Sequence, residues 1–219
     1  MRTSLVLLLT LSCGTGTLGE KPVEGLSGDQ ALARLMAGNQ RYVKHRAQHP
    51  DESLARRKAL VSGQHPYAVI LGCADSRVPP ELTFDEGLGD LFVIRVAGNI
   101  ADDAVLGSIE YAIEHLGTKL IVVLGHEQCG AVSAAVEGGE AAGHLKALVA
   151  AIQPSVQETA NDAGDKIHNC VIANARRVAR QIRESEPLKE YVEGKGVKVA
   201  AADYMLDSGK VNLLDASHP

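Results

Sequence analysis

The sequence predicts an α/β fold in which a mostly parallel β-sheet is covered by helices on both faces. Three runs are apolar at every position, at residues 67–71, 91–94 and 120–124. Runs that do not alternate with polar residues are typical of strands buried on both faces, as in parallel sheets. Residues 102–115, between the second and third runs, place apolar side chains at helical spacing. The order strand, helix, strand is the right-handed crossover that builds a parallel sheet.

Helices and a final hairpin complete the predicted fold. An amphipathic helix over residues 29–44, with Asp29 as its cap, precedes the first strand. The other predicted elements are a shorter basic helix at 51–61, a loop around Gly138, Gly139 and Gly143, a long helix at 166–184, a strand at 197–202 and its hairpin partner at 211–214.

Length and composition indicate one globular domain and exclude nucleic acid as a partner. The chain has 219 residues, and a typical domain has about 150. Hydrophobic residues make up 45% and charged residues 22%, which is the balance of a packed soluble protein. The net charge of -5 provides no cationic field for phosphates. Aromatic residues are only 3% and Trp is absent, so there is no platform for stacking bases.

The first 19 residues read as a secretory signal peptide, which leaves residues 20–219 as a single domain. Arg2 precedes a short apolar run at residues 5–11, and small residues end at Gly19. The run is much shorter than the roughly 20 residues of a transmembrane helix, so no transmembrane segment is predicted. We expect a periplasmic or secreted protein. Cys13 offers an alternative, a lipoprotein anchor, although Thr10 stands where that signal prefers Leu.

Cysteine usage argues against a disulfide framework. The four cysteines are Cys13, Cys73, Cys129 and Cys170, and removal of the leader leaves three. An odd number cannot pair completely, even in an exported protein. A bound metal is the simplest protection for exported thiolates.

Polar clusters follow two of the predicted strands. Cys73 and Asp75 come directly after the first run, and His126 and Cys129 come after the third. Ligands of open parallel sheets bind at the carboxyl ends of the strands. Cys73, His126 and Cys129 would therefore lie together, and their sulfur and imidazole donors suit Zn²⁺.

Two kinds of zinc site are compatible with these residues. If Asp75 joins Cys73, His126 and Cys129, the site has four protein ligands and is structural. Arg77 favours the open, catalytic alternative, because its planar guanidinium can hold the Asp75 carboxylate away from the metal. Cys170 is interpreted as a buried apolar residue outside the site.

The motifs closely resemble those of the β-class carbonic anhydrases of bacteria and plants. The resemblance extends from about Ser27 to Leu214, which is nearly the whole mature chain. It rests on Cys73-Ala-Asp-Ser-Arg77, His126-x-x-Cys129, residues 92–99 (FVIRVAGN), residues 107–112 (GSIEYA), residues 38–42 (GNQRY) and Tyr204.

The resemblance implies a Rossmann-like fold with one Zn²⁺ per subunit, held by Cys73, His126 and Cys129. Asp75 and Arg77 would be the catalytic dyad that positions zinc-bound hydroxide. The implied activity is the reversible hydration of carbon dioxide to bicarbonate and a proton. The implied assembly is a homodimer or homotetramer in which the N-terminal helices pack on a neighbouring subunit.

One part of the family pattern is missing. Some bacterial members close the site by binding bicarbonate in a noncatalytic pocket made by Trp, Arg and Tyr. Arg95 and Tyr204 stand at two of these positions, but Ile70 stands at the third. Two other functions remain at this point: hydrolysis of carbon disulfide on the same scaffold, and a non-enzymatic zinc protein closed by Asp75.

Overall fold

The computed structural model describes residues 25–214 and contains a five-stranded sheet in the order β2-β1-β3-β4-β5. The strands are β1 (Ala68–Gly72), β2 (Leu91–Arg95), β3 (Leu120–His126), β4 (Lys198–Tyr204) and β5 (Val211–Leu214). The first four are parallel, and β5 returns antiparallel to β4. The predicted parallel sheet and its final hairpin are confirmed.

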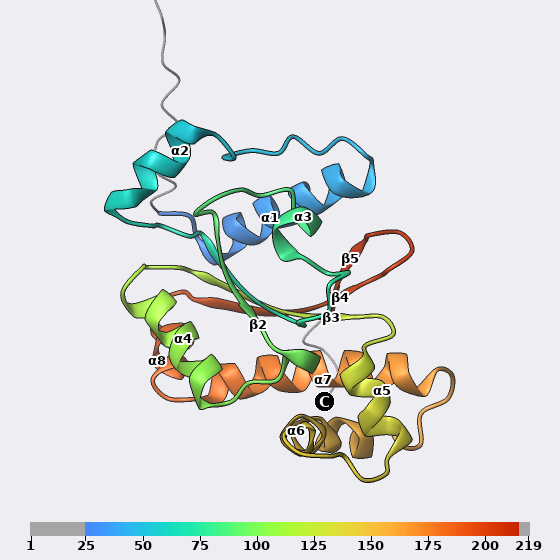
Figure 1. The fold of residues 1–219 in the computed structure, drawn as a ribbon. Helices are drawn as coiled ribbons and strands as arrows, with labels where there is room; N and C mark the ends of the chain where they lie inside the picture. The colour runs from blue at the N-terminus through green and yellow to red at the C-terminus, as the bar shows by residue number, and fades with distance from the viewer. Residues whose placement is uncertain (1–24, 215–219) are drawn as a thin grey trace, which may run out of the picture.

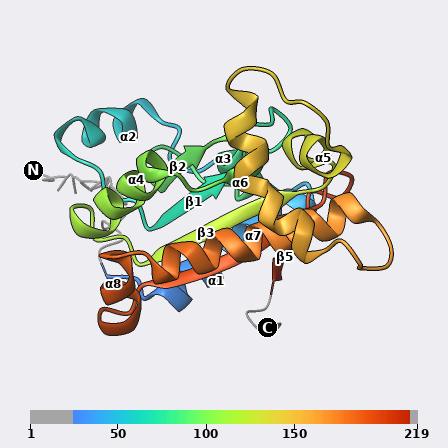
Figure 2. The same ribbon diagram turned by 90° about the horizontal axis from the view of Figure 1, so that it is seen from below.

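Helices cover the sheet on both faces (Figure 1). One face carries α1 (Gly28–Val43), α2 (Leu54–Ala59) with the short 3-10 turn η1 (Leu60–Ser62), and α3 (Pro80–Thr83). The other carries α4 (Asp103–Glu114), α5 (Gly130–Glu137), α6 (Leu145–Glu158), α7 (Lys166–Glu184) and α8 (Leu188–Gly194), while the 3-10 turn η2 (Ala97–Asn99) follows β2. Figure 2 shows α7 lying along the length of the sheet. No helix among residues 25–214 is long and apolar enough to cross a membrane.

The helices at 102–115 and 166–184 are confirmed, but the first helix begins differently from the prediction. Ser27, not Asp29, is the N-cap of α1. Its hydroxyl accepts from the backbone N–H of Gln30, and the Gln30 side chain accepts from the backbone N–H of Ser27. This reciprocal capping box satisfies two otherwise free donors, which a cap at Asp29 would not.

The structure places α1 on the sheet of its own chain. Ala31 and Leu35 are fully buried and belong to the core. Asn39 fixes the end of the helix: its amide donates to the carbonyls of Thr83 and Gly209 at 3.0 and 2.8 Å, and its oxygen accepts from Val211 N–H at 2.9 Å. The first helix thus has a packing partner within its own chain. In contrast, α2 buries no residue within this chain.

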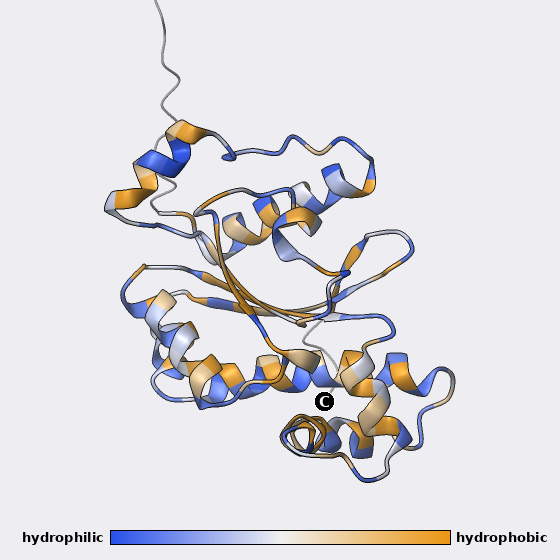
Figure 3. Cartoon of the chain, in the orientation of Figure 1, coloured by the Kyte–Doolittle hydropathy of each residue, from blue (hydrophilic) through white to orange (hydrophobic). Residues whose placement is uncertain are grey.

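Alternate residues of each strand face opposite helical layers, as the period of two requires. In β1, Ile70 packs into the cluster that contains Leu35 of α1, whereas Val69 and Leu71 pack with Ile109 of α4 and Val178 of α7. The apolar strands lie between more mixed helices in Figure 3. Both faces of β1 and β3 are thus buried, which explains their uninterrupted apolar runs, whereas β2 at the edge of the sheet is only partly buried.

Strand pairing brings the loops after β1, β2 and β3 to one edge. Gly72 at the end of β1 lies beside Arg95 of β2 and Leu124 of β3. After β1 the chain first adds β2 on one side and then β3 on the other. Such a change of direction leaves a crevice at the carboxyl ends of the strands, where ligands of open α/β sheets bind.

Candidate metal centre

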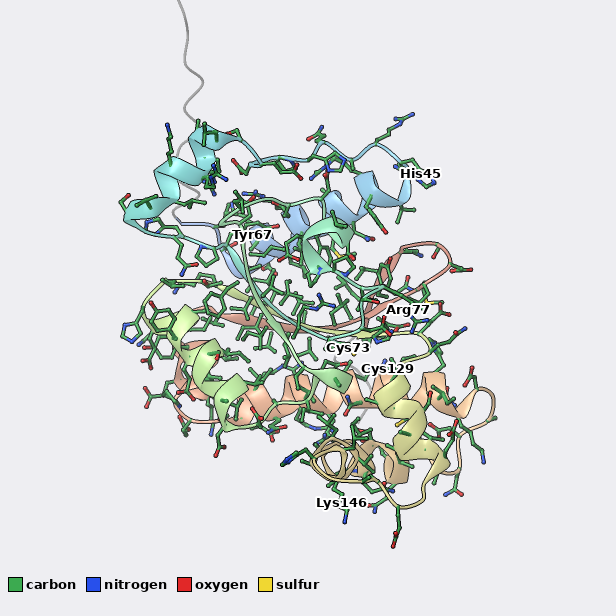
Figure 4. The ribbon with its side chains drawn as sticks, viewed as in Figure 1. His45, Tyr67, Cys73, Arg77, Cys129 and Lys146 are labelled. Carbon is green, nitrogen blue, oxygen red and sulfur yellow. The ribbon has the colours of Figure 1, made fainter. Side chains whose placement is uncertain are left out.

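Cys73, His126 and Cys129 meet at this edge of the sheet. One ligand atom from each lies within 4.8 Å of the others, and the two sulfur atoms are 3.9 Å apart. The exposed fractions of the three residues are 4%, 0% and 1%. Figure 4 shows Cys73 and Cys129 next to one another where the strands end. The predicted juxtaposition of the three residues is present.

Three different elements supply these side chains. Cys73 follows β1, His126 ends β3, and Cys129 is the N-cap of α5. The pairing of β1 with β3 sets the first two side by side. Residues 127–128 then form a turn, with Gln128 at a φ of 51°, which brings Cys129 next to Cys73.

The imidazole of His126 is oriented as in a metal ligand. Its Nδ1 lies 2.8 Å from the carbonyl oxygen of Glu127, which can only accept, so Nδ1 carries the proton. Nε2 is then a lone-pair donor. This atom is buried and has no hydrogen-bond partner among residues 25–214. A buried acceptor without a partner is costly, and a bound cation would satisfy it.

The two thiols and the imidazole form an electrostatically coupled group. A hydrogen bond from the Cys129 thiol lowers the pKa of Cys73 to about 4 against the opposing effect of burial. The same hydrogen bond and burial raise the pKa of Cys129. Burial disfavours protonated His126, but interaction with Cys73 outweighs it and raises the pKa. A metal cation that binds to these side chains would displace the protons of the two thiols.

These donors fit zinc. Two sulfur atoms and one imidazole nitrogen are a common ligand set of catalytic zinc sites, which keep one position open. Cys73, His126 and Cys129 would hold the ion. Cys170 is fully buried in α7 and is not part of this group, as predicted.

Asp75 lies beside the three residues but is held by Arg77. The guanidinium donates to both carboxylate oxygens, from Nε to Oδ1 at 2.9 Å and from Nη2 to Oδ2 at 2.7 Å. The backbone N–H of Arg77 also donates to Oδ1 at 2.9 Å. These bonds lower the pKa of Asp75 to about 2, so it is ionised near neutral pH. Its Oδ2 is nevertheless only 4.0 Å from Nε2 of His126.

Two further contacts join the loops around the centre. Arg77 Nη2 donates to the carbonyl of Gln128 at 3.2 Å, which links the loop after β1 to the loop after β3. The backbone N–H of Gly98 donates to the Cys73 sulfur at 3.3 Å. Gly98 has a φ of 71°, a conformation that favours glycine. Gly98 belongs to the motif at residues 92–99, but residue type alone does not predict its contact with the Cys73 sulfur.

Ile70, Arg95 and Tyr204 have different surroundings. Ile70 is fully buried in the core. The Tyr204 hydroxyl lies 3.4 Å from that of Tyr42. Arg95 donates to main-chain carbonyls of the loop after β1.

Comparison with known proteins identifies the family. The family model described as carbonic anhydrase matches residues 68–211. Carbonic anhydrase 2 of Mycobacterium tuberculosis is 42% identical over 190 residues, which cover 84% of this chain and 92% of the relative. A carbonic anhydrase of Pseudomonas aeruginosa is 33% identical over 173 residues, covering 73% of this chain and 78% of its own.

Solved structures agree with this assignment. The β-carbonic anhydrase CafA of Aspergillus fumigatus superposes with a TM-score of 0.70 at 25% identity, over 86% of this chain and 92% of that chain. A β-carbonic anhydrase of Sordaria macrospora gives a TM-score of 0.68 at 23% identity, over 84% and 96% of the respective chains. The chain belongs to the carbonic anhydrase family, in its β class, and is therefore an enzyme.

Proposed function

We propose that this enzyme catalyses the reversible hydration of carbon dioxide to bicarbonate and a proton, with one zinc ion per subunit. Cys73, His126 and Cys129 would hold the zinc. The observation that carries the proposal is the convergence of their ligand atoms within 4.8 Å, in a chain of the carbonic anhydrase family.

When bound, zinc would act as a Lewis acid that makes hydroxide available as a nucleophile near neutral pH. The chain's own contribution is to place and orient the reactants. Asp75 is ionised, so both of its oxygens act as hydrogen-bond acceptors. A carboxylate beside the centre would accept a hydrogen bond from the attacking group and so keep the lone pair of that group aimed at the carbon of carbon dioxide.

Arg77 makes this role possible because its guanidinium holds the Asp75 carboxylate by two hydrogen bonds. The Asp75 carboxyl group is 18% exposed and the Arg77 side chain 48% exposed, whereas the three ligands are buried. The accessible side of the centre is therefore the side with the dyad. Because Arg77 holds both oxygens of Asp75, we propose that the fourth metal position is open in the active form.

Cys129→Ser tests the proposed zinc site. A neutral hydroxyl replaces a sulfur ligand in a site with only three, so zinc measured by elemental analysis should fall strongly and hydration should fall with it. Cys170→Ser is the matched control and should keep both. Full zinc and full activity in Cys129→Ser would contradict the proposal, and zinc loss in Cys170→Ser would mean that the wrong cysteine was assigned.

We also propose that the enzyme is a homodimer or homotetramer. In the described chain β2 is at the end of the sheet and has β1 on one side only, and free strand edges favour pairing with another chain. The helix α2 buries no residue, and Val61 next to it is 86% exposed. The matched Sordaria macrospora protein is described as tetrameric. Analytical ultracentrifugation should detect a dimer or tetramer, and a stable monomer would contradict this.

The apolar leader supports a proposal about location that concerns residues outside those described. We propose export, with cleavage after Gly19 or a lipid on Cys13, giving a periplasmic, secreted or membrane-tethered enzyme. Mass spectrometry of the protein from its native cells should find an N-terminus near Glu20 or a lipid-modified Cys13. An intact Met1 on a cytosolic protein would contradict export.

A further inference from the structure

Arg95 is bonded to the main chain that carries the centre, and the proposed chemistry gives it no role. From the end of β2 its Nε donates to the carbonyl of Cys73 at 2.9 Å, and its Nη2 donates to the carbonyl of Asp75 at 2.5 Å. One guanidinium therefore spans the two residues that provide a sulfur ligand and the carboxylate of the dyad.

The position of Arg95 follows from the sheet. Its Cα lies opposite Gly72, the last residue of β1, and Val96 N–H donates to the carbonyl of Gly72 at 3.1 Å. Strand pairing thus fixes the base of the Arg95 side chain beside the point where the loop leaves β1. Through its two hydrogen bonds, the planar guanidinium then fixes the main chain of the loop as far as its third residue, Asp75.

Asp75, in the loop after β1, makes further hydrogen bonds through both its main chain and its side chain. The Asp75 carbonyl also accepts from Val78 N–H at 3.2 Å, so it receives two donors. The side chain of Asp75 is fixed separately by Arg77. Arg95 therefore constrains the main chain of Asp75, and Arg77 constrains its carboxylate.

We propose that Arg95 is a positioning residue, which holds residues 73–75 so that the Cys73 sulfur and the Asp75 carboxylate keep their places at the metal centre. The proposal rests on the proposed zinc site. In this role Arg95 does not contact the substrate, because its guanidinium is hydrogen-bonded to main-chain carbonyls of the protein.

Arg95→Ala tests this in the zinc-loaded enzyme by two readouts besides activity. Hydrogen exchange, measured by mass spectrometry, should rise in the peptide that covers residues 73–78 and stay native in peptides from β4. Zinc transfer to a chelator should accelerate by about tenfold or more, the usual effect of losing a group that orients a metal ligand. Arg95→Lys keeps one donor and should restore part of both properties.

Arg56→Ala is the matched control. Arg56 also donates from Nε to a main-chain carbonyl, that of Leu88, at 2.9 Å, but Leu88 lies in the loop before β2, away from the carboxyl ends of the strands. This variant should show native zinc transfer and native exchange at residues 73–78. Native values of both readouts in Arg95→Ala would overturn the proposal, as would increased exchange spread evenly over the whole chain.

The test separates this proposal from the proposed function. If the unsubstituted enzyme holds zinc but does not hydrate carbon dioxide, the proposed function is refuted. Faster zinc transfer to a chelator in Arg95→Ala would still support the positioning role of Arg95. Native protein that holds no zinc would overturn both.

Discussion

The Arg77 guanidinium holds the two carboxylate oxygens of Asp75 by separate hydrogen bonds of 2.9 and 2.7 Å. Asp75 is also close enough to compete for the metal, since its Oδ2 is 4.0 Å from the free nitrogen of His126. The same carboxylate therefore has two possible partners, Arg77 in an open site and the metal in a closed site. With zinc bound as proposed, the partner of Asp75 would decide whether water can reach the fourth metal position.

Arg77→Ala should trap the closed site. Without the guanidinium, Asp75 has only the metal to bind, so turnover should fall by about 10- to 100-fold while zinc content stays native. Arg77→Lys should recover little, because an ammonium cannot hold both oxygens. Stopped-flow hydration assays with zinc analysis measure both quantities. Near-native turnover in Arg77→Ala would contradict the role of the dyad.

Hydration activity should rise between about pH 7 and 8.5, around the known pKa of about 7 for zinc-bound water in the carbonic anhydrase with three histidine ligands. The pKa of Asp75 is about 2, so Asp75 stays ionised throughout this range and does not produce the rise. Higher pH also favours hydroxide over carboxylate at the metal. A pH profile of turnover that is flat or falls over this interval would be inconsistent with an open zinc site.

Bicarbonate should act as an ordinary product inhibitor. The position of the family's regulatory Trp is occupied by the fully buried Ile70, and Arg95 is engaged with main-chain carbonyls. Initial rates measured over a bicarbonate series should follow a hyperbolic inhibition curve. A sigmoidal curve would show that a cooperative anion pocket exists after all.

Asp90 should make stability depend on pH. Burial raises its pKa from 3.8 to about 6, despite an ion pair with Arg34 at 3.2 Å. The folded state thus binds the Asp90 proton more tightly than the unfolded state does. The associated stability is present below about pH 4 and is lost as pH rises through about 6.

Asp90→Asn should therefore gain free energy of unfolding relative to the native enzyme as pH rises from about 4 to about 6. Urea unfolding of both proteins at each pH measures this difference in stability. A difference between the two proteins that does not change with pH, or changes in the opposite direction, would contradict the raised pKa.

Much of the fold could be predicted because the strongest patterns have simple physical causes. The apolar runs that form β1 and β3 are buried along their whole length, whereas the run that forms β2 at the edge of the sheet is only partly buried. The amphipathic pattern of α7 matches its observed bounds, Lys166–Glu184. Helices with weaker patterns were missed. Small residues dominate α5, and α6 contains Pro154, which sequence rules place outside helices.

The site could be predicted from its side chains but not from its main chain. Cys73, His126 and Cys129 follow neighbouring strands, so their convergence is a consequence of the sheet. The pairing of Arg77 with Asp75 follows from their spacing and charge. The bonds from Arg95 to two carbonyls and from Gly98 to the Cys73 sulfur depend on strand register and loop conformation, which residue types alone do not specify.

Zinc held by Cys73, His126 and Cys129 is proposed to drive the hydration of carbon dioxide. Stopped-flow hydration at about pH 8.5, followed through removal of zinc by a chelator and its return, tests this most directly. We predict that activity disappears with the metal and recovers in proportion to the zinc rebound, up to one ion per subunit. Activity that persists in the metal-free enzyme, or none in the fully zinc-loaded enzyme, would contradict the account.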